Sequence, residues 1–389
     1  MKSNYKQLGE FIRQIDVRNT DGKEENLLGV SVQKKFMPSI ANTVGTDFTK
    51  YKVVKKGQFT YIPDTSRRGD KIGIALLEDY DEGLVSNVYT VFEVIDEKKL
   101  IPQYLMLWFS RPEFDRYARF KSHGSVREVM DWDEMCKVEL PVPSYEEQLN
   151  IVESYKAITD RIALKQKIND NLEAQAQAFF QEKFAVFYST NELPDGYSLV
   201  NLDRLCIIKG GKRLPADSEL LDYPTEHPYI RVRDIGNSRY VCLTNEFQYI
   251  DEIMHSAISR YVVNTSDIII SIVGTIGLFG KVHSSLDKAN LTENCVKLSD
   301  IHTVTSDYLY YTLCYKKQIK EIELLTVGAV QAKLPIYNIQ SMKIIVPPVD
   351  VMEQFQHKID IFNKQIEANI IEIQKLNELQ RIVLAKLSD

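Results

Sequence analysis

The sequence predicts an α+β fold in which two pseudo-repeated modules are separated by a long antiparallel two-helix coiled coil. Three observations support this fold: a repeat with a period of about half the chain, a heptad pattern after each copy, and short β-type runs beside a helical stretch within each copy. The 389 residues suit two or three domains. We expect the first module at residues 1–143, the first long helix at 144–189, the second module at 190–345 and the second long helix at 346–389.

The repeat is clearest where each module ends. Residues 140–148 (LPVPSYEEQ) and 346–354 (VPPVDVMEQ) each indicate a strand end, a proline turn and a Glu-Gln pair at a helix start. Pro347 follows Pro141 by 206 positions. Three further pairs of segments match in the same order: 123–127 with 327–331 at an offset of 204, 51–54 with 260–263, and, more weakly, 8–12 with 202–206. Because order and spacing agree while the residues differ, the pattern indicates two related domains with different ligands.

The segments after both proline turns have apolar residues at alternating steps of four and three. These a/d heptads are typical of helices that pair side by side, and the two stripes superpose at an offset of 204. The predicted helix–helix seam consists of Ile151, Tyr155, Ile158, Ile162, Leu172 and Phe179 in the first helix and Phe355, Ile359, Phe362, Ile366, Ile373, Leu376 and Val383 in the second. Lys165 and Asn169 interrupt the first stripe, and Asn369 and Gln380 interrupt the second. An asparagine at a seam can fix the register of two helices at some cost in stability.

The first helix, at roughly 146–184, would span on the order of 55 Å at ~1.5 Å per residue. A rod of this length could hold two modules about one turn of B-DNA apart, which is ~34–36 Å. The alternative, that each helix simply packs on its own module, stays open at this point.

Each module combines short β-type runs with one helical stretch, and this mixture indicates an α+β module. The β-type runs are 51–54, 59–62, 72–77 and 88–94 in the first module and 229–232, 267–273 and 295–298 in the second, and the helical stretches are 102–120 and 306–324.

Basic and polar residues gather on the predicted loops of both modules. Arginine and lysine can bind phosphate or the guanine edge, glutamine can pair with adenine, and glycine allows the backbone to approach a phosphate closely. The candidate DNA contacts are Lys34, Lys35, Ser66, Arg67, Arg68, Lys71, Ser125 and Arg127 in the first module and Lys209, Lys212, Arg213, Arg231, Arg233, Gln331 and Lys333 in the second. Because a charged loop is often simply solvated, each single candidate competes with that interpretation.

Composition excludes several classes of protein. Hydrophobic residues at 44% and charged residues at 26% indicate a folded chain, and no apolar run is long enough for a membrane span. The net charge of −6 means that any nucleic-acid contact must come from local basic patches. Five scattered cysteines without a Cys-x-x-Cys pair suit reduced thiols in a cytoplasm, and no histidine pattern has metal-ligand spacing, so we expect no metal site.

Two segments match catalytic or nucleotide-binding motifs only in part. Residues 274–281 (GTIGLFGK) resemble a phosphate-binding loop, but Thr275 occupies the position of the first glycine and Val282 that of the Ser or Thr, so we predict a tight turn between strands. Asp64 with Glu97 and Lys99 loosely imitates a nuclease metal site that the second module lacks. A Mg²⁺-dependent nuclease therefore remains a minor alternative, beside a coiled-coil scaffold for protein interactions.

With these features in place, the chain resembles the specificity subunits of type I restriction–modification systems over essentially its whole length. The resemblance rests on the duplicated turn with Glu147-Gln148 and Glu353-Gln354, each after a Gly-Ser/Ala-Val-Arg/Gln segment and before a heptad helix. Residues 68–74 (RGDKIGI) and 85–87 (VSN) also look like the family's first target-recognition domain. The turn residues at 144–145 and 349–350 depart from the family's more usual proline-leucine.

The resemblance implies two target-recognition domains that each bind half of a split DNA site, on two helices that space them and dock two methyltransferase (M) subunits. Restriction (R) subunits with nuclease and ATP-driven translocase activity would join the complex. Adenine would be methylated with S-adenosylmethionine. On this hypothesis S-adenosylmethionine, ATP and Mg²⁺ belong to the partner subunits. The chain itself would bind double-stranded DNA, hold no cofactor, catalyse nothing and act in the cytoplasm away from membranes.

Overall fold

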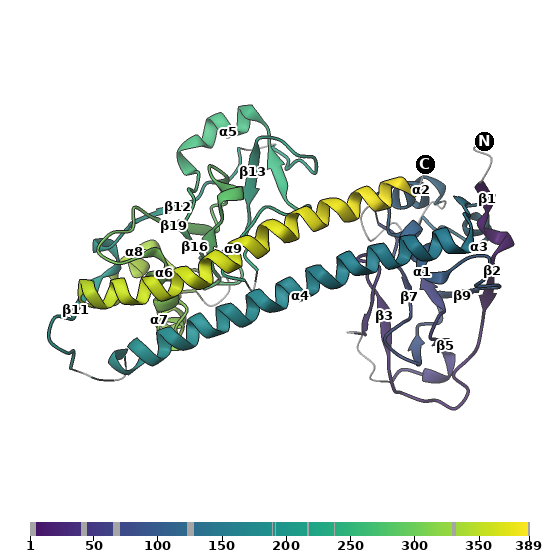
Figure 1. Ribbon diagram of the computed structural model, residues 1–389, viewed down its shortest axis with the longest axis horizontal. Helices are drawn as coiled ribbons and strands as arrows, with labels where there is room; N and C mark the ends of the chain where they lie inside the picture. Colours follow the sequence, from purple (N-terminus) through teal and green to yellow (C-terminus); the bar gives the residue numbers. More distant parts are fainter. Residues whose placement is uncertain are drawn as a thin grey trace. The chain divides into compact units, whose positions relative to one another are not determined.

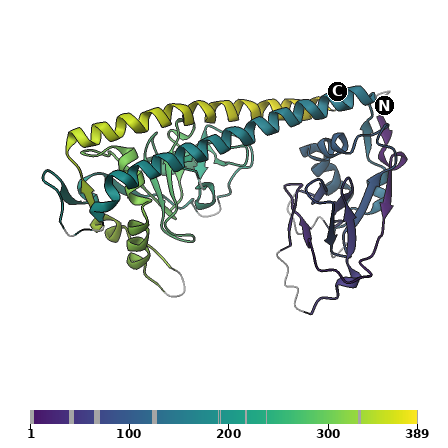
Figure 2. The ribbon, with the colours of Figure 1, turned by 60° about the horizontal axis from the view of Figure 1, so that its bottom comes forward.

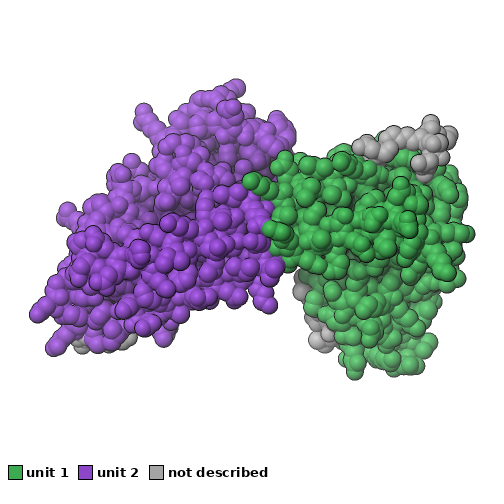
Figure 3. Space-filling view, in the orientation of Figure 1, with its two compact units in different colours: residues 1–163, 375–389 green, residues 164–374 purple. Residues whose placement is uncertain are grey.

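The computed structural model describes residues 5–39, 45–64, 71–122, 128–188, 190, 192–215, 218–236, 238–328 and 332–387. The chain divides into two compact units, one of residues 1–163 with 375–389 and the other of residues 164–374 (Figure 3). Each unit joins one globular module to the stretches of both long helices that pack on it. This grouping by compactness does not test the four-segment division predicted from the sequence, which stays a prediction.

Two long helices, α4 (Tyr145–Phe184) and α9 (Val349–Lys386), dominate the chain and lie side by side in both ribbon views (Figures 1 and 2). A capping box starts α4, because the Ser144 amide donates to the Glu147 carboxylate at 2.9 Å while the Glu147 amide donates to Ser144 Oγ at 3.4 Å. Hydrogen bonds from the Ser144 hydroxyl and amide also hold the pKa of Glu147 below its usual range. The glutamate of the first Glu-Gln pair therefore has a local, structural role.

The two helices pair antiparallel, as the heptads predict. Within the second unit, Phe179 stacks on Phe355 with ring centroids 5.8 Å apart, and Lys165 pairs with Glu372 at 2.8 Å. Within the first unit, Gln380 donates to the Thr159 hydroxyl at 2.7 Å. Residues late in α4 therefore contact residues early in α9, as antiparallel helices do. Every predicted seam residue is buried or half-buried. The predicted fold, two modules with an antiparallel two-helix coiled coil, is confirmed.

The polar residues that interrupt the seam are bonded to one another. Asn369 is fully buried, and its amide donates to Asn169 Oδ1 at 2.7 Å. Lys165 and Gln365 both donate to Asn369 Oδ1 at 3.1 Å. A polar group at this position is satisfied only in one alignment of the helices, so the asparagine pair specifies the register.

We predict opposite results from single and double substitution of this pair. Asn369→Leu should cost about 1–3 kcal/mol, because it leaves the half-buried amide of Asn169 without its partner. Replacing Asn169 and Asn369 together by leucine should recover most of that loss, since both polar groups are then gone. Urea denaturation of wild type, the two single variants and the double variant, followed by circular dichroism, measures the cycle. A double variant as unstable as the sum of the two single variants would contradict the paired arrangement.

The first module is built on a sheet with the strand order β2-β9-β6-β7, covered by short helices. Its core stacks Phe59 on Phe92 at 4.8 Å, with Phe109 edge-on to both rings. The strands are β1 (Tyr5–Gln7), β2 (Ile12–Ile15), β3 (Leu28–Val30), β4 (Phe36–Pro38), β5 (Lys52–Lys55), β6 (Phe59–Tyr61), β7 (Ile74–Leu76), β8 (Glu82–Val85), β9 (Thr90–Val94) and β10 (Glu139–Pro141). The helices are η1 (Leu8–Glu10), η2 (Phe48–Lys50), α1 (Pro102–Phe109), α2 (Pro112–Lys121) and α3 (Trp132–Cys136).

The second module repeats this plan, with the strand order β12-β19-β16-β17-β14. Its strands are β11 (Ser198–Asn201), β12 (Ile207–Gly210), β13 (His227–Ile230), β14 (Tyr240–Val241), β15 (Gln248–Ile250), β16 (Ile268–Ser271), β17 (Phe279–Val282), β18 (Asn290–Leu291), β19 (Cys295–Ser299) and β20 (Lys343–Val346). Its helices are η4 (Leu202–Arg204), η5 (Val232–Asp234), α5 (Glu252–Ile258), η6 (Ser259–Tyr261), η7 (Ser284–Leu286), α6 (Ser306–Leu313), α7 (Lys316–Leu325) and α8 (Ile336–Ser341), and η3 (Ala185–Tyr188) follows α4.

The repeat extends to single hydrogen bonds. Tyr104 donates its hydroxyl to the Pro141 carbonyl, and Tyr308, 204 positions later, donates to the Ile345 carbonyl. The first strands close on the same partners, since β1 pairs with β10 and β11 pairs with β20. The two-residue difference between the offsets of the turns and of the helices is visible in the burial. Gln148 is fully buried, whereas Gln354 is exposed and Met352, 204 positions after Gln148, occupies the buried place.

The predicted helical stretches 102–120 and 306–324 are each two helices. In the first module Pro112 breaks the helix, because it lacks an amide hydrogen and holds Arg111 in an extended conformation at φ −77° and ψ 140°. In the second module Tyr315 has the same extended backbone without a following proline. Its ring is buried against Phe180 and Tyr188, so tertiary packing makes this break.

Candidate nucleic-acid interface

Connecting loops converge at one end of the first module's sheet. Ile15 lies opposite Val91, and Tyr61 lies opposite both Thr90 and Ile74, so β2 and β6 end where β7 and β9 begin. The loop between β6 and β7 is joined to the loop between α2 and α3, because the Met130 amide donates to the Pro63 carbonyl at 3.0 Å. We call this region the loop end of the module.

The second module has the same loop end. Gly210 lies opposite Val296, and Ser271 lies opposite Cys295, so the loops after β12 and β16 and before β19 lie together. Here the Leu334 amide donates to the Ile272 carbonyl at 2.9 Å, in the manner of Met130 and Pro63. Of the predicted candidates that the structure describes, Lys71 belongs to this loop pair in the first module and Lys333 belongs to it in the second.

The candidates fall into three groups. Ser66, Arg67, Arg68, Ser125, Arg127 and Gln331 lie outside the described residues. Lys35, Lys71, Lys209, Lys212, Arg213, Arg233 and Lys333 lie exposed on the surface. The two remaining candidates, Lys34 and Arg231, have their charges engaged inside the protein.

Lys34 has its charge engaged inside the first module by an ion pair with Asp115. Its ammonium lies 2.6 Å from both Asp115 Oδ1 and the Phe109 carbonyl, and its side chain is only 8% exposed. Burial lowers the pKa of Lys34, against the opposing effect of the Asp115 carboxylate. Because the Ile72 amide also donates to Asp115, the ion pair fastens the β3–β4 turn and the β6–β7 loop to α2. Lys34 therefore supports the loops that present Lys35 and Lys71.

Arg231 also has its charge engaged within its own module, by an ion pair with Asp234. Its Nε and Nη2 atoms bond to the two oxygens of Asp234 at 2.9 Å, and its Nη1 atom contacts Gln248. The Arg-x-x-Asp spacing could have indicated this ion pair from the sequence, because side chains at i and i+3 share a face of a helical turn. The pair closes η5 and leaves the exposed Arg233 beside it.

Steric crowding explains why residue 211 is glycine, instead of the close approach of the backbone to a phosphate that was predicted. An added Cβ at Gly211 would collide with the carbonyl groups of Leu291 and Thr292, so only glycine fits where β12 leaves the sheet. The next two residues point outward from this fixed backbone. Lys212 lies over the Tyr261 ring at 5.7 Å, and Arg213 is 81% exposed while pairing with Glu293 at 2.8 Å.

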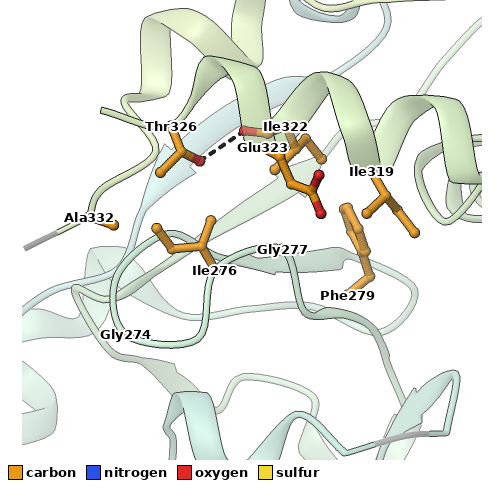
Figure 4. A pocket seen from close by; sticks show the side chains of 9 residues that line it. All are labelled: Gly274, Ile276, Gly277, Phe279, Ile319, Ile322, Glu323, Thr326 and Ala332. Atoms are coloured by element: carbon orange, nitrogen blue, oxygen red, sulfur yellow. Dashed lines mark hydrogen bonds between the residues drawn. The ribbon is translucent and has the colours of Figure 1, made fainter. Parts of the chain in front are cut away.

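The segment that resembles a phosphate loop is the turn of the β16–β17 hairpin, as predicted. Gly274 and Gly277 have φ angles of 81° and 79°, and Lys281 is buried in the strand rather than open to a ligand. The turn faces α7 across a cavity of about 310 Å³, shown in Figure 4. The lining is mainly apolar, with the Glu323 carboxylate beside Phe279.

The three residues of the nuclease alternative, Asp64, Glu97 and Lys99, do not come together in one site. Tyr61 pairs with Thr90 and Phe59 with Phe92, so Asp64 follows one end of the β6–β9 ladder while Glu97 follows the other. Lys99 lies 3.9 Å from Asp96 instead. Among the residues that the structure describes, no group of three His, Cys, Asp or Glu side chains is placed to hold a metal ion.

A buried ionic cluster in the second unit escaped the sequence analysis. Lys281 Nζ lies 2.5 Å from Asp307 Oδ1, and Arg239 Nη1 lies 3.5 Å from the same oxygen. Burial opposes ionisation of Asp307, but Lys281 and Arg239 outweigh it and hold the pKa of that carboxyl below its usual range. The three residues are far apart in the sequence, so no spacing could have signalled the cluster.

Known proteins share the sequence pattern of this chain. The family model described as type I restriction modification DNA specificity domain matches residues 9–174 and 194–382. The chain is 23% identical over 314 residues to the type I restriction enzyme MjaIX specificity subunit of Methanocaldococcus jannaschii, covering 76% of this chain and 70% of that protein. It is 22% identical over 455 residues to the type I restriction enzyme HindI specificity subunit of Haemophilus influenzae, covering 98% and 97%.

A crystal structure of the S subunit of a type I restriction–modification system from M. genitalium shares the fold, with a TM-score of 0.53 and 14% identity over 99% of this chain and 96% of that chain. Within the described ranges, no helix is both long and apolar enough to cross a lipid bilayer.

Two modules of one topology on an antiparallel helix pair define the class of paired recognition-domain proteins. The chain belongs to the type I restriction modification DNA specificity family, because the family model matches both halves of it. It is a specificity subunit of such a system, with two target-recognition domains.

Proposed function

We propose that this chain binds a split DNA site, with one half-site at the loop end of each module, and leaves all catalysis to partner subunits. The observation that supports this most directly is the pair of modules with one topology and different loop residues. A scaffold that occurs twice in one chain can bind two short DNA sequences. Because the loops of the two modules differ, the two bound sequences should differ as well. The exposed residues Lys35 and Lys71 in one module and Lys333 in the other are the proposed contacts within the described loops.

The partners follow from the same proposal. Two methyltransferase subunits would dock on the helix pair, and restriction subunits would complete the assembly. S-adenosylmethionine, ATP and Mg²⁺ would be held by those subunits, with adenine as the methylated base. The net charge of −6 supports this division, because a chain that is negative as a whole gains by taking further phosphate contacts from its partners.

The test is methylation by the complex of this chain with its cognate methyltransferase subunit, read out by sequencing modified genomic DNA. We expect a motif with two short specified parts and an unspecified gap. Arg67→Ala with Arg68→Ala should relax or abolish only one part, while Gln331→Ala with Lys333→Ala should affect only the other, by about 1–3 kcal/mol for each lost base contact. Lys56→Ala is the matched charge control, because Lys56 is exposed just before β6, at the end of the sheet opposite to the loop end.

Binding of the same complex to an oligonucleotide should weaken as salt rises, by a log–log slope that becomes smaller by roughly one for each phosphate contact removed. A continuous motif, or both loop variants acting on the same part, would contradict the proposal. Partner binding with no dependence on DNA sequence would favour the scaffold alternative.

A further inference from the structure

The buried ionic cluster connects the second module to both long helices. Asp307 Oδ2 accepts from Asn363 and from Gln356 of α9, each at 2.9 Å. Arg239 Nη2 donates to Asn363 Oδ1 at 2.5 Å, and the Arg239 Nε atom lies 3.3 Å from Glu173 of α4. The cluster therefore joins a loop, a strand and a helix of the module to specific side chains of the coiled coil.

This attachment is separate from the apolar anchor of the same module. The anchor lies at the start of α9, where Met352, Phe355 and Ile359 are buried in the module's main core. The polar contacts extend from Gln356 to Glu367, which pairs with His283 at 3.1 Å. At ~1.5 Å per residue this is roughly 16 Å along the helix. The second module is thus held along a length of α9 rather than at one point.

The first module lacks this second attachment at the equivalent positions. Gln103, 204 positions before Asp307, bonds to Glu78 at the surface of the module. Thr159, 204 positions before Asn363, bonds to Tyr155 and Gln380 within the helix pair. The helix residues packed on the core of the first module are instead Leu149, Ile151, Val152, Tyr155, Leu384 and Leu387.

We propose that the cluster of Arg239, Lys281 and Asp307 with Gln356 and Asn363 positions the second module on the helix pair and so sets the gap between the two half-sites. Apolar packing is non-directional, whereas hydrogen bonds between charged and polar groups are satisfied in one geometry only. Buried ion pairs add little net stability against apolar replacements, so orientation is the property they can supply here. This inference rests on the proposed function, because it concerns the spacing of a split site.

The experiment uses the complex with the methyltransferase subunit and duplexes that hold both half-sites at the native gap, or at a gap one base pair longer or shorter. The quantity measured is the ratio of kcat/KM for methylation at the native gap to that at each altered gap. Gln356→Ala with Asn363→Ala removes the three hydrogen bonds of the cluster to α9 and keeps the Lys281–Asp307 ion pair. We expect the ratio to fall by at least about fivefold, since each of these hydrogen bonds is worth about that much.

Two controls separate orientation from stability. Leu309→Ala removes a fully buried side chain of α6 outside the cluster, so it should lower the melting temperature without changing the ratio. Gln356→Ala alone is a milder variant that should give a smaller fall, and it serves if the double variant folds poorly. An unchanged ratio in the double variant, or an equal fall in Leu309→Ala, would overturn the inference alone. A wild-type complex indifferent to the gap would overturn the proposed function with it.

Discussion

Replacing Phe355 by alanine is expected to lower the free energy of unfolding of the second unit by about 3–5 kcal/mol, the usual cost of deleting a buried aromatic ring. The ring is 2% exposed and packs from α9 against α4 and α6. It contacts five other aromatic rings at centroid distances of 5.3–6.3 Å, namely Phe179, Phe180, Phe184, Tyr308 and Tyr311. Alanine would leave a cavity that these rings, fixed on two helices, can close only in part.

Urea denaturation of wild type and variant, followed by circular dichroism, measures this loss. Ile361→Ala is the matched control, because Ile361 lies on the same helix and is 54% exposed. We expect the control to change stability by no more than about 0.5 kcal/mol. Equal and small effects of the two substitutions would show that α9 is not part of the module's core.

Replacing Asp307 by asparagine should have a comparable effect, about 3–5 kcal/mol, because it leaves the buried charges of Arg239 and Lys281 without their carboxylate. The side chain of Asp307 is 5% exposed and accepts from Lys281 and Arg239 through one oxygen and from Gln356 and Asn363 through the other. Asparagine preserves the size of the side chain, so packing alone should change little.

The pH dependence of that loss tests its electrostatic origin. Since the folded-state pKa of Asp307 lies below its unfolded value, ionised Asp307 contributes stability above the unfolded pKa of about 3.9. That contribution disappears as the pH falls through the folded-state pKa. The difference between wild type and Asp307→Asn should therefore be constant from about pH 5 to 8 and shrink below about pH 4. A difference independent of pH down to acid unfolding would assign the effect to lost shape instead.

Much of this fold was predictable because its signals are local or periodic. The a/d heptads of α4 and α9 place an apolar residue on one face every three or four positions, and such a face must be covered by another helix. Pro141 and Pro347 mark the ends of the modules, and the change of period after them marks the helices. The four polar residues that break the stripe were also visible, and all four form hydrogen bonds across the helix pair.

The DNA contacts in the loops were harder to predict, because the sequence does not show whether a basic side chain faces solvent or an internal carboxylate. Lys34 and Arg231 were predicted as DNA contacts from their neighbours in the sequence, and both are ion-paired within their modules. For Arg231 the partner is three residues away and could have been considered. For Lys34 the partner is Asp115, 81 positions distant, and only the packing of a turn on α2 brings them together.

The sequence by itself determined the duplicated architecture, the helix pairing and the family, because periodicity, turn residues and repeat order survive changes of individual side chains. Only the tertiary structure decided which charges are internal, why α6 ends before Tyr315 without a proline, and where Arg239, Lys281 and Asp307 meet Asn363. Those features depend on distances between residues up to 135 positions apart in the chain, as Phe180 and Tyr315 are. Such distances are set by the packing of whole elements, which no single segment of the sequence specifies.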